Sequence, residues 1–147
     1  MIALDTNILV YAHREEMPLH ARARAVVEEV ADEPGAWGIP WPCVHEFLAV
    51  VSNPRVFKKP TPMATALSVI ESIYELANSV FLAEGETHFA TLAQVLRAAH
   101  VTGAVVHDGR IAAICITHGV RELWSADRDF SRFPQLTVRN PLVTLPQ

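Results

Sequence analysis

Short apolar stretches alternate with longer helical patterns along the whole chain, and this alternation limits the folds that the sequence can adopt. Strands joined through helices need crossover connections, which produce a mostly parallel sheet with helices on both faces. The sequence therefore predicts an α/β fold in which a mostly parallel central sheet is flanked by helices. The predicted strands are residues 1–5, 37–39, 79–84, 121–127 and 136–140, and the predicted helices are residues 6–13, 19–32, 40–54, 63–77, 86–100 and 105–118.

The length and composition of the chain are those of one globular domain. The 147 residues suit a single domain, 1–147, and a content of 50% hydrophobic residues is enough to build a buried core. No apolar run is long enough to cross a bilayer and no basic segment opens the chain, so we expect a cytoplasmic protein without membrane association. Cys43 and Cys115 lie in apolar helical patterns, which predicts buried free thiols.

The charge balance restricts how this protein can meet a nucleic acid. The formal net charge is −4, whereas domains that hold nucleic acid by bulk electrostatics are usually basic. An enzyme that meets phosphate groups through a metal ion is still compatible with this charge.

Two aspartates follow directly after predicted strands. Asp5 ends the apolar stretch "IAL", and Asp127 follows "ELWSA". An unpaired carboxylate is costly to bury, and ligands in open α/β sheets bind beyond the carboxyl ends of the strands. We therefore expect Asp5 and Asp127 to lie at the same edge of the sheet, where a ligand would bind.

Two further acids belong to helices. Asp108 lies in the first turn of residues 105–118, where a carboxylate that stabilises the helix N-terminus is a common alternative. Glu46 borders the apolar side of residues 40–54, where a chance polar residue is the alternative. Two carboxylates ~4 Å apart repel each other by roughly 4 kcal/mol at an effective dielectric constant of about 20. A cluster of Asp5, Glu46, Asp108 and Asp127 would thus need cations, and oxygen-only ligands favour Mg²⁺ or Mn²⁺ and metal-assisted phosphodiester hydrolysis.

Four motifs in this order carry a family resemblance: "LDTNIL", "HEF", "HDGRIAA" and "SADRDFSRFP". The chain resembles the PIN-domain ribonucleases, and among them the VapC-like toxins, over almost its whole length. The resemblance implies a Rossmann-like, PIN-like sandwich, RNA cleavage that depends on Mg²⁺ or Mn²⁺, a homodimer, and inhibition by a small cognate antitoxin. It assigns metal binding and catalysis to Asp5, Glu46, Asp108 and Asp127, and supporting positions to Thr6, Asn7, Ser125 and Asp129.

The chain departs from the family pattern at two places. Ser125 stands where the family more often has Thr, which preserves the hydroxyl group. Gly109 puts a poor helix former directly after Asp108, and we expect it to loosen the placement of that acid. Asp129 is a second candidate for the fourth acid, ranked below Asp127. Replacing Asp5 by Asn is expected to preserve the fold, and even to stabilise the metal-free protein, because it removes a charge from the cluster.

Basic side chains near the acids are candidates for contact with RNA phosphates or with the antitoxin. Arg55, Lys58 and Lys59 share one loop, for which a merely solvated surface is the alternative. Arg128 and Arg132 flank Asp127 and are alternatively ion-pair partners of Asp127 or Asp129.

Two other functions compete with that of a ribonuclease. A haloacid-dehalogenase-like phosphatase also has an aspartate at the end of its first strand, but it needs a second aspartate where this chain has Asn7. A catalytically inactive PIN-like binding protein is the other alternative, and the presence of all four acids disfavours it.

Overall fold

A computed structural model describes residues 1–143, and a five-stranded sheet forms its centre. The strand order is β3-β2-β1-β4-β5, and every neighbouring pair is parallel. The predicted α/β fold is thus confirmed, with a sheet that is entirely parallel. The strands are β1 (Ile2–Leu4), β2 (Trp37–Pro40), β3 (Ser79–Leu82), β4 (Glu122–Trp124) and β5 (Val138–Arg139).

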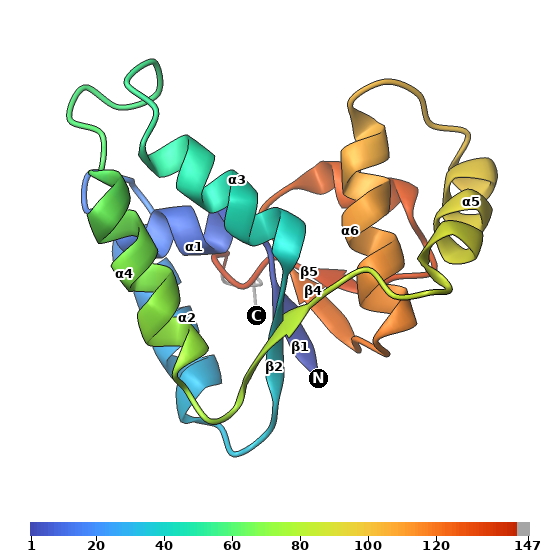
Figure 1. Ribbon diagram of the computed structural model, residues 1–147, viewed down its shortest axis with the longest axis horizontal. Coiled ribbons are helices and arrows are strands. Elements are labelled where there is room, and N and C mark those ends of the chain that lie inside the picture. Colours follow the sequence, from blue (N-terminus) through green and yellow to red (C-terminus); the bar gives the residue numbers. More distant parts are fainter. Residues whose placement is uncertain (144–147) are drawn as a thin grey trace.

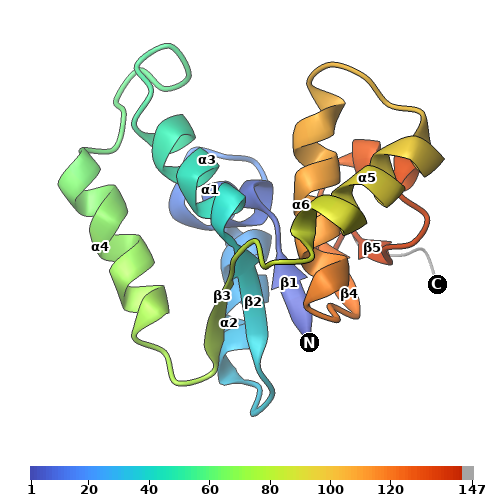
Figure 2. The same ribbon diagram turned by 45° about the vertical axis from the view of Figure 1, so that its right-hand side comes forward.

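Helices cover both faces of the sheet, as the crossover connections require. Helices α1, α2 and α4 lie to one side, and α5 and α6 lie to the other (Figures 1 and 2). The helices are α1 (Thr6–His13), α2 (His20–Asp32), α3 (Trp41–Val51), α4 (Met63–Tyr74), α5 (His88–Ala99) and α6 (Val105–Thr117), followed by a 3₁₀ helix, η1 (Arg128–Arg132). The predicted helices agree with these to within a few residues at their ends, whereas the sequence indicates only a turn at η1.

The core explains why the short strands read as apolar runs. All three residues of β1 are buried, because this strand has a neighbour on each side and helices on each face. Trp37 and Phe47 are among the largest fully buried side chains. Cys43 and Cys115 are both free and buried, as predicted. Across residues 1–143, no helix combines the length and apolar character that a membrane span requires.

The strand order creates a crevice at the end of β1. The chain continues from β1 to β2 and β3 on one side, and β4 and β5 are added on the other side, so the order reverses between β1 and β4. Ligands of open α/β proteins bind at such a switch point. The backbone N–H of Asp5 donates to the carbonyl of Trp124 at 3.0 Å, and Asp127 follows β4. The two predicted strand-end aspartates therefore lie at the same edge of the sheet.

Gly109 has a packing role in addition to the effect expected from its low helix propensity. A Cβ atom at this position would lie 2.5 Å from Cδ2 of Leu96 and 3.5 Å from Cε1 of Phe133. The missing side chain allows α6 to approach α5 and the segment after η1.

Candidate active site

Asp5 is the most enclosed acid of the site. Its side chain is only 4% exposed, and it caps the N-terminus of α1 by accepting a hydrogen bond from the backbone N–H of Thr6 at 2.8 Å. Its other oxygen, Oδ2, accepts from the Ser125 hydroxyl at 2.6 Å and from the Asn7 amide at 2.8 Å. The Cys43 thiol donates to Oδ1 at 3.5 Å. Burial raises the pKa of Asp5, an effect that the hydrogen bonds from Ser125, Thr6 and Cys43 oppose and the charge of Glu46 reinforces.

Ser125 connects the end of β4 to the end of β1. Its hydroxyl donates to Asp5 and accepts from the Asn7 amide at 3.1 Å and from the backbone N–H of Asp127 at 2.9 Å. A hydroxyl group can donate one hydrogen bond and accept two, so the Ser125 hydroxyl forms all the hydrogen bonds that it can. The Asn7 carbonyl oxygen in turn accepts from the backbone N–H of Ala126 at 3.0 Å. Ser125 and Asn7 thus both contact Asp5 and connect it to the end of β4, and the contacts of Ser125 are made by the hydroxyl group that it shares with Thr.

Glu46 reaches the site from α3. The Thr6 hydroxyl donates to its Oε2 atom at 2.9 Å, which connects this exposed side chain to the N-terminus of α1. Thr6 itself is buried. The Thr6 hydroxyl therefore orients Glu46 in the same way that the Ser125 hydroxyl orients Asp5.

Asp108, Asp127 and Asp129 form a compact group on the far side of the site. Each offers a carboxylate oxygen within 4.8 Å of the oxygens offered by the other two. Asp127 caps η1, because its side chain accepts from the backbone N–H of Asp129 at 2.8 Å. The sequence indicated Asp129 as an alternative to Asp127, whereas in the structure both aspartates lie beside Asp108. The tight turn of η1 folds the two acids together, and the Asp-x-Asp spacing was the only signal of it in the sequence.

All four predicted acids line one cavity of about 330 Å³, which we call the acidic cavity: Asp5, Glu46, Asp108 and Asp127. The charges act on one another there. Partial burial and then the charges of Asp127, Asp5, Asp129 and Glu46, in decreasing order, raise the pKa of Asp108 to about 6. This cavity is therefore strongly negative when its carboxylates are ionised.

Most of the predicted basic residues are on the surface near this cavity. Arg55, Lys58 and Lys59 are exposed on the loop after α3, and the same loop brings Val56 and Phe57 to the acidic cavity. Arg128 and Arg132 are exposed as well. Neither arginine forms an ion pair with Asp127 or Asp129 in the described part of the chain.

A neighbouring groove of about 590 Å³ runs between α3 and α6. It shares Glu46 and Asp108 with the acidic cavity, and His45, His107 and Arg110 also line it. The two histidines are exposed. Arg110 is paired with Glu84. Glu46 and Asp108 thus lie where the acidic cavity meets this groove. Basic side chains line the groove but not the acidic cavity.

The fold and the site define a class of protein: a Rossmann-like α/β domain with a carboxylate-lined cavity at its topological switch point. Comparison with known proteins makes the class specific. The PIN-domain family model matches residues 2–136. A VapC ribonuclease of Mycobacterium bovis, Mb2897, is 33% identical over 142 residues, which cover 97% of this chain and 96% of the relative. The chain belongs to the PIN-domain family, and its curated relatives are VapC ribonucleases.

Solved structures share the fold. FitAB bound to the IR36 DNA fragment matches with a TM-score of 0.73 at 23% identity, covering 99% of each chain. A toxin–antitoxin complex from Klebsiella pneumoniae matches with a TM-score of 0.63 at 16% identity, covering 96% of this chain and 98% of the other. These similarities confirm the predicted PIN-like sandwich.

Proposed function

We propose that this protein is an endoribonuclease that requires Mg²⁺ or Mn²⁺ and acts as the toxin of a toxin–antitoxin pair. The observation that carries the proposal is the convergence of Asp5, Glu46, Asp108 and Asp127 on one cavity at the switch point of a PIN domain. The relatives named as VapC ribonucleases cover nearly the whole chain. Asn7 donates to Asp5 from the position where a haloacid-dehalogenase-like phosphatase needs its second aspartate, which disfavours that alternative.

The acidic cavity fits a hard divalent cation. Its candidate ligands are carboxylate oxygens. Partial burial and, after it, repulsion by the neighbouring acids raise the pKa of Asp108, and a cation would relieve that repulsion. Asp5, Glu46, Asp108 and Asp127 would hold the ion, with Asp129 as an additional oxygen donor in the group of three aspartates. When bound, Mg²⁺ or Mn²⁺ would supply a water nucleophile of lowered pKa and would offset negative charge on the phosphodiester.

The supporting side chains have a separate task, which is to fix the carboxylates. Asp5 accepts four hydrogen bonds and cannot rotate without breaking several of them. Thr6 restrains Glu46 in the same way. A site whose charges are held in place before the substrate arrives needs little reorganisation during the reaction. Arg55, Lys58 and Lys59, and in addition Arg128 and Arg132, supply the positive charge outside the cavity that RNA phosphates require.

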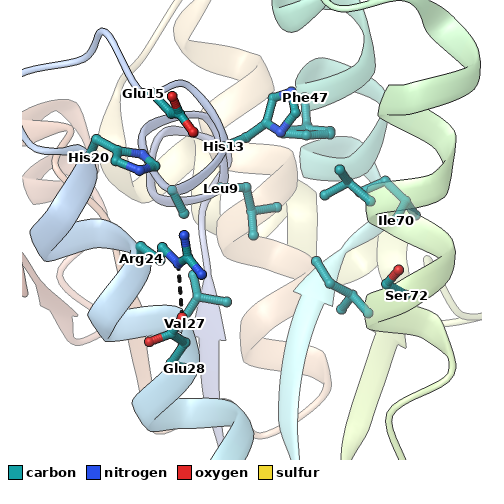
Figure 3. Close-up of a pocket in the computed structure, with 13 residues that line it drawn as sticks. Leu9, His13, Glu15, His20, Arg24, Val27, Glu28, Phe47, Ile70 and Ser72 are labelled. Atoms are coloured by element: carbon teal, nitrogen blue, oxygen red, sulfur yellow. Dashed lines mark hydrogen bonds and ion pairs between the residues drawn. The ribbon is translucent and has the colours of Figure 1, made fainter.

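The antitoxin partner is assigned to a groove among four helices, which we call the helical groove. Its volume is about 500 Å³, and Leu9 from α1, Val27 from α2, Phe47 from α3 and Ile70 from α4 line it. Figure 3 shows these apolar side chains inside the groove, with His20, Arg24 and Glu28 along one rim. An apolar floor with a charged rim suits the apolar face of an amphipathic helix. The helical groove and the acidic cavity lie on different sides of α1, because Leu9 lines the groove and Val10 lines the cavity.

Ile73→Asp is expected to weaken antitoxin binding while RNA cleavage stays unchanged. Ile73 lines the helical groove and is half-buried in the free protein. Burying even a neutral polar group under an apolar helix face costs about 1–3 kcal/mol and burying a carboxylate costs more, so Kd should rise by at least about 5-fold. Titration calorimetry with the small protein encoded beside this chain measures the effect. Ser68→Asp, on an exposed part of the same helix, is the matched control, and equal affinities for the two variants would contradict the assignment.

A homodimer is also part of the proposal. Several large apolar side chains stay exposed on α4 and the edge strand β3, and a second copy of the chain would cover them: Met63, Leu67, Tyr74 and Val80. Sedimentation equilibrium tests the dimer, and a monomer at every micromolar concentration would rule it out.

RNA cleavage by the purified chain tests the proposed function directly. Single-stranded and hairpin RNAs should be cut internally in Mg²⁺ or Mn²⁺, and a chelator should stop the reaction because the negative cavity then repels the phosphodiester. Gel analysis of end-labelled RNA measures the cleavage, with a small phosphomonoester assayed in parallel. Turnover of the phosphomonoester alone would indicate a phosphatase, and the absence of both activities would indicate a binding protein.

A further inference from the structure

Half of the acidic cavity is apolar, and the cleavage reaction itself makes no use of this half. Its lining residues are Tyr11, Met17, Val50, Val56 and Phe57, which face the same space as the carboxylates. The volume of about 330 Å³ lies at the lower end of the range of about 300–1,000 Å³ that small-molecule sites occupy. There is room for one small ring system and none for a helical duplex.

The loop that forms one wall of this apolar half is held in place from behind. The guanidinium of Arg14 lies 4.1 Å from the centre of the Phe57 ring. Arg14 also donates to the Thr61 hydroxyl at 2.9 Å and to the carbonyl of Lys59 at 2.8 Å. The backbone N–H of Thr61 donates to the carbonyl of Val51 at 2.8 Å. The wall is therefore built before any ligand arrives, which lowers the ordering cost of binding.

The two hollows that meet at the acids differ in their lining. None of the described side chains that line the acidic cavity is basic. Arg110, His45 and His107 line the neighbouring groove together with Glu46, Asp108 and Asp129, and Arg110 is paired with Glu84. The arginine and imidazole nitrogens that a sugar–phosphate chain can contact are therefore found in the groove and not in the acidic cavity. An uncharged, flat, aromatic group is favoured on the apolar side, where Tyr11 is half-buried and accessible for stacking.

We propose that the apolar half of the acidic cavity binds one unpaired nucleobase next to the phosphodiester that is cut. This inference rests on the proposed ribonuclease function and adds a subsite to it, which holds one unpaired and unstacked base beside the cut. A base inside a duplex is stacked on both faces and cannot enter a cavity of this size, while a base in a loop or a single strand can. Tyr11 supplies the stacking surface, and Phe57 and Val56 add apolar lining to the same cavity.

Abasic substitution in a cleaved RNA tests the proposal. A hairpin library with a randomised loop first identifies an RNA that the parent protein cuts. Each loop base near the cut is then removed in turn, and kcat/KM is measured for the parent protein and for Tyr11→Ala. Loss of one particular base should lower kcat/KM of the parent roughly 5- to 100-fold, the range expected for one base–aromatic stack. Tyr11→Ala should show the same loss on the intact RNA and no further loss on that abasic RNA.

Control variants separate stacking from folding. Tyr11→Phe keeps the ring and should lose much less kcat/KM than Tyr11→Ala. Val56→Asp places a charge at a position that is 53% exposed and should lower kcat/KM without disturbing the core. Phe89→Ala, at a side chain that is 79% exposed on α5, is the control for loss of an aromatic ring elsewhere. Cleavage by the parent that is indifferent to every abasic position would overturn the base site and leave the ribonuclease intact. A parent that cuts no RNA would overturn the proposed function, and the base site with it.

Discussion

Asp108→Asn is expected to lower metal-dependent RNA cleavage by at least about 100-fold, while the free energy of unfolding stays unchanged or rises by about 1 kcal/mol at neutral pH. Asp108 is the acid whose pKa responds to all four of its acidic neighbours. Asparagine preserves the size of the Asp108 side chain and removes its charge. The cluster therefore loses one metal ligand, and the repulsion among the remaining carboxylates is smaller. Because Asp108 is only partly buried, solvent screening limits the gain in stability.

Cleavage rates at limiting Mn²⁺ and chemical unfolding of the metal-free protein, measured side by side, check this expectation. Asp32→Asn, at the exposed end of α2, is the matched control and should change neither quantity. A structural acid would behave in the opposite way, because its removal would lower stability. Undiminished cleavage by Asp108→Asn would refute the role proposed for this residue.

Asp5→Asn should differ from Asp108→Asn, contrary to what the sequence alone predicts. Each Asp5 oxygen accepts from neighbouring donors, which include the Asn7 amide and the Ser125 hydroxyl. An asparagine NH₂ group would face these donors and leave at least one of them without an acceptor, at a cost of about 1–3 kcal/mol. The expectation of a stabilised metal-free protein therefore holds for Asp108 and not for Asp5.

Mn²⁺ is expected to stabilise the protein strongly above pH 6 and weakly at pH 5. Partial burial and the neighbouring acids raise the pKa of Asp108 from 3.8 to about 6, and burial raises the pKa of Asp5 as well. Over that interval the folded state binds more protons than the unfolded state, so the metal-free protein loses stability as the pH rises from about 4 to about 6. Metal ligation needs the ionised carboxylates, so metal binding strengthens over the same interval.

Thermal unfolding with and without Mn²⁺ across this pH range measures both effects. A metal concentration of 100 times Kd should add about 2.7 kcal/mol, and each kcal/mol raises Tm by about 2–4 °C for a chain of this size. Asp108→Asn should reduce both the pH dependence of the metal-free protein and the response to Mn²⁺. A Tm that is equally insensitive to Mn²⁺ at pH 5 and pH 8 would contradict a metal site in the acidic cavity.

The sequence alone was sufficient to predict the order of the strands and helices along the chain. It also indicated the acids that follow β1 and β4. Both predictions depend on local physics. Apolar periodicity identifies the helices and strands, and an aspartate directly after a buried strand is rarely buried unless its carboxylate has a partner. The motifs around Asp5, Glu46, Asp108 and Asp127 were sufficient to indicate the PIN family. The 3₁₀ helix η1 gave no periodic signal because it is short, and the sequence therefore indicated Asp129 only as a second candidate for the fourth acid.

The tertiary structure alone decided which groups touch. Ser125 meets Asp5 across a separation of 120 residues, and Leu96 meets the space beside Gly109; neither contact follows from local sequence pattern. The same holds for the apolar half of the acidic cavity, whose Tyr11 and Phe57 come from segments far apart in the chain. Periodicity specifies which face of an element is apolar, but only the packing of elements against one another specifies the partner of each side chain, because many packings satisfy the same pattern.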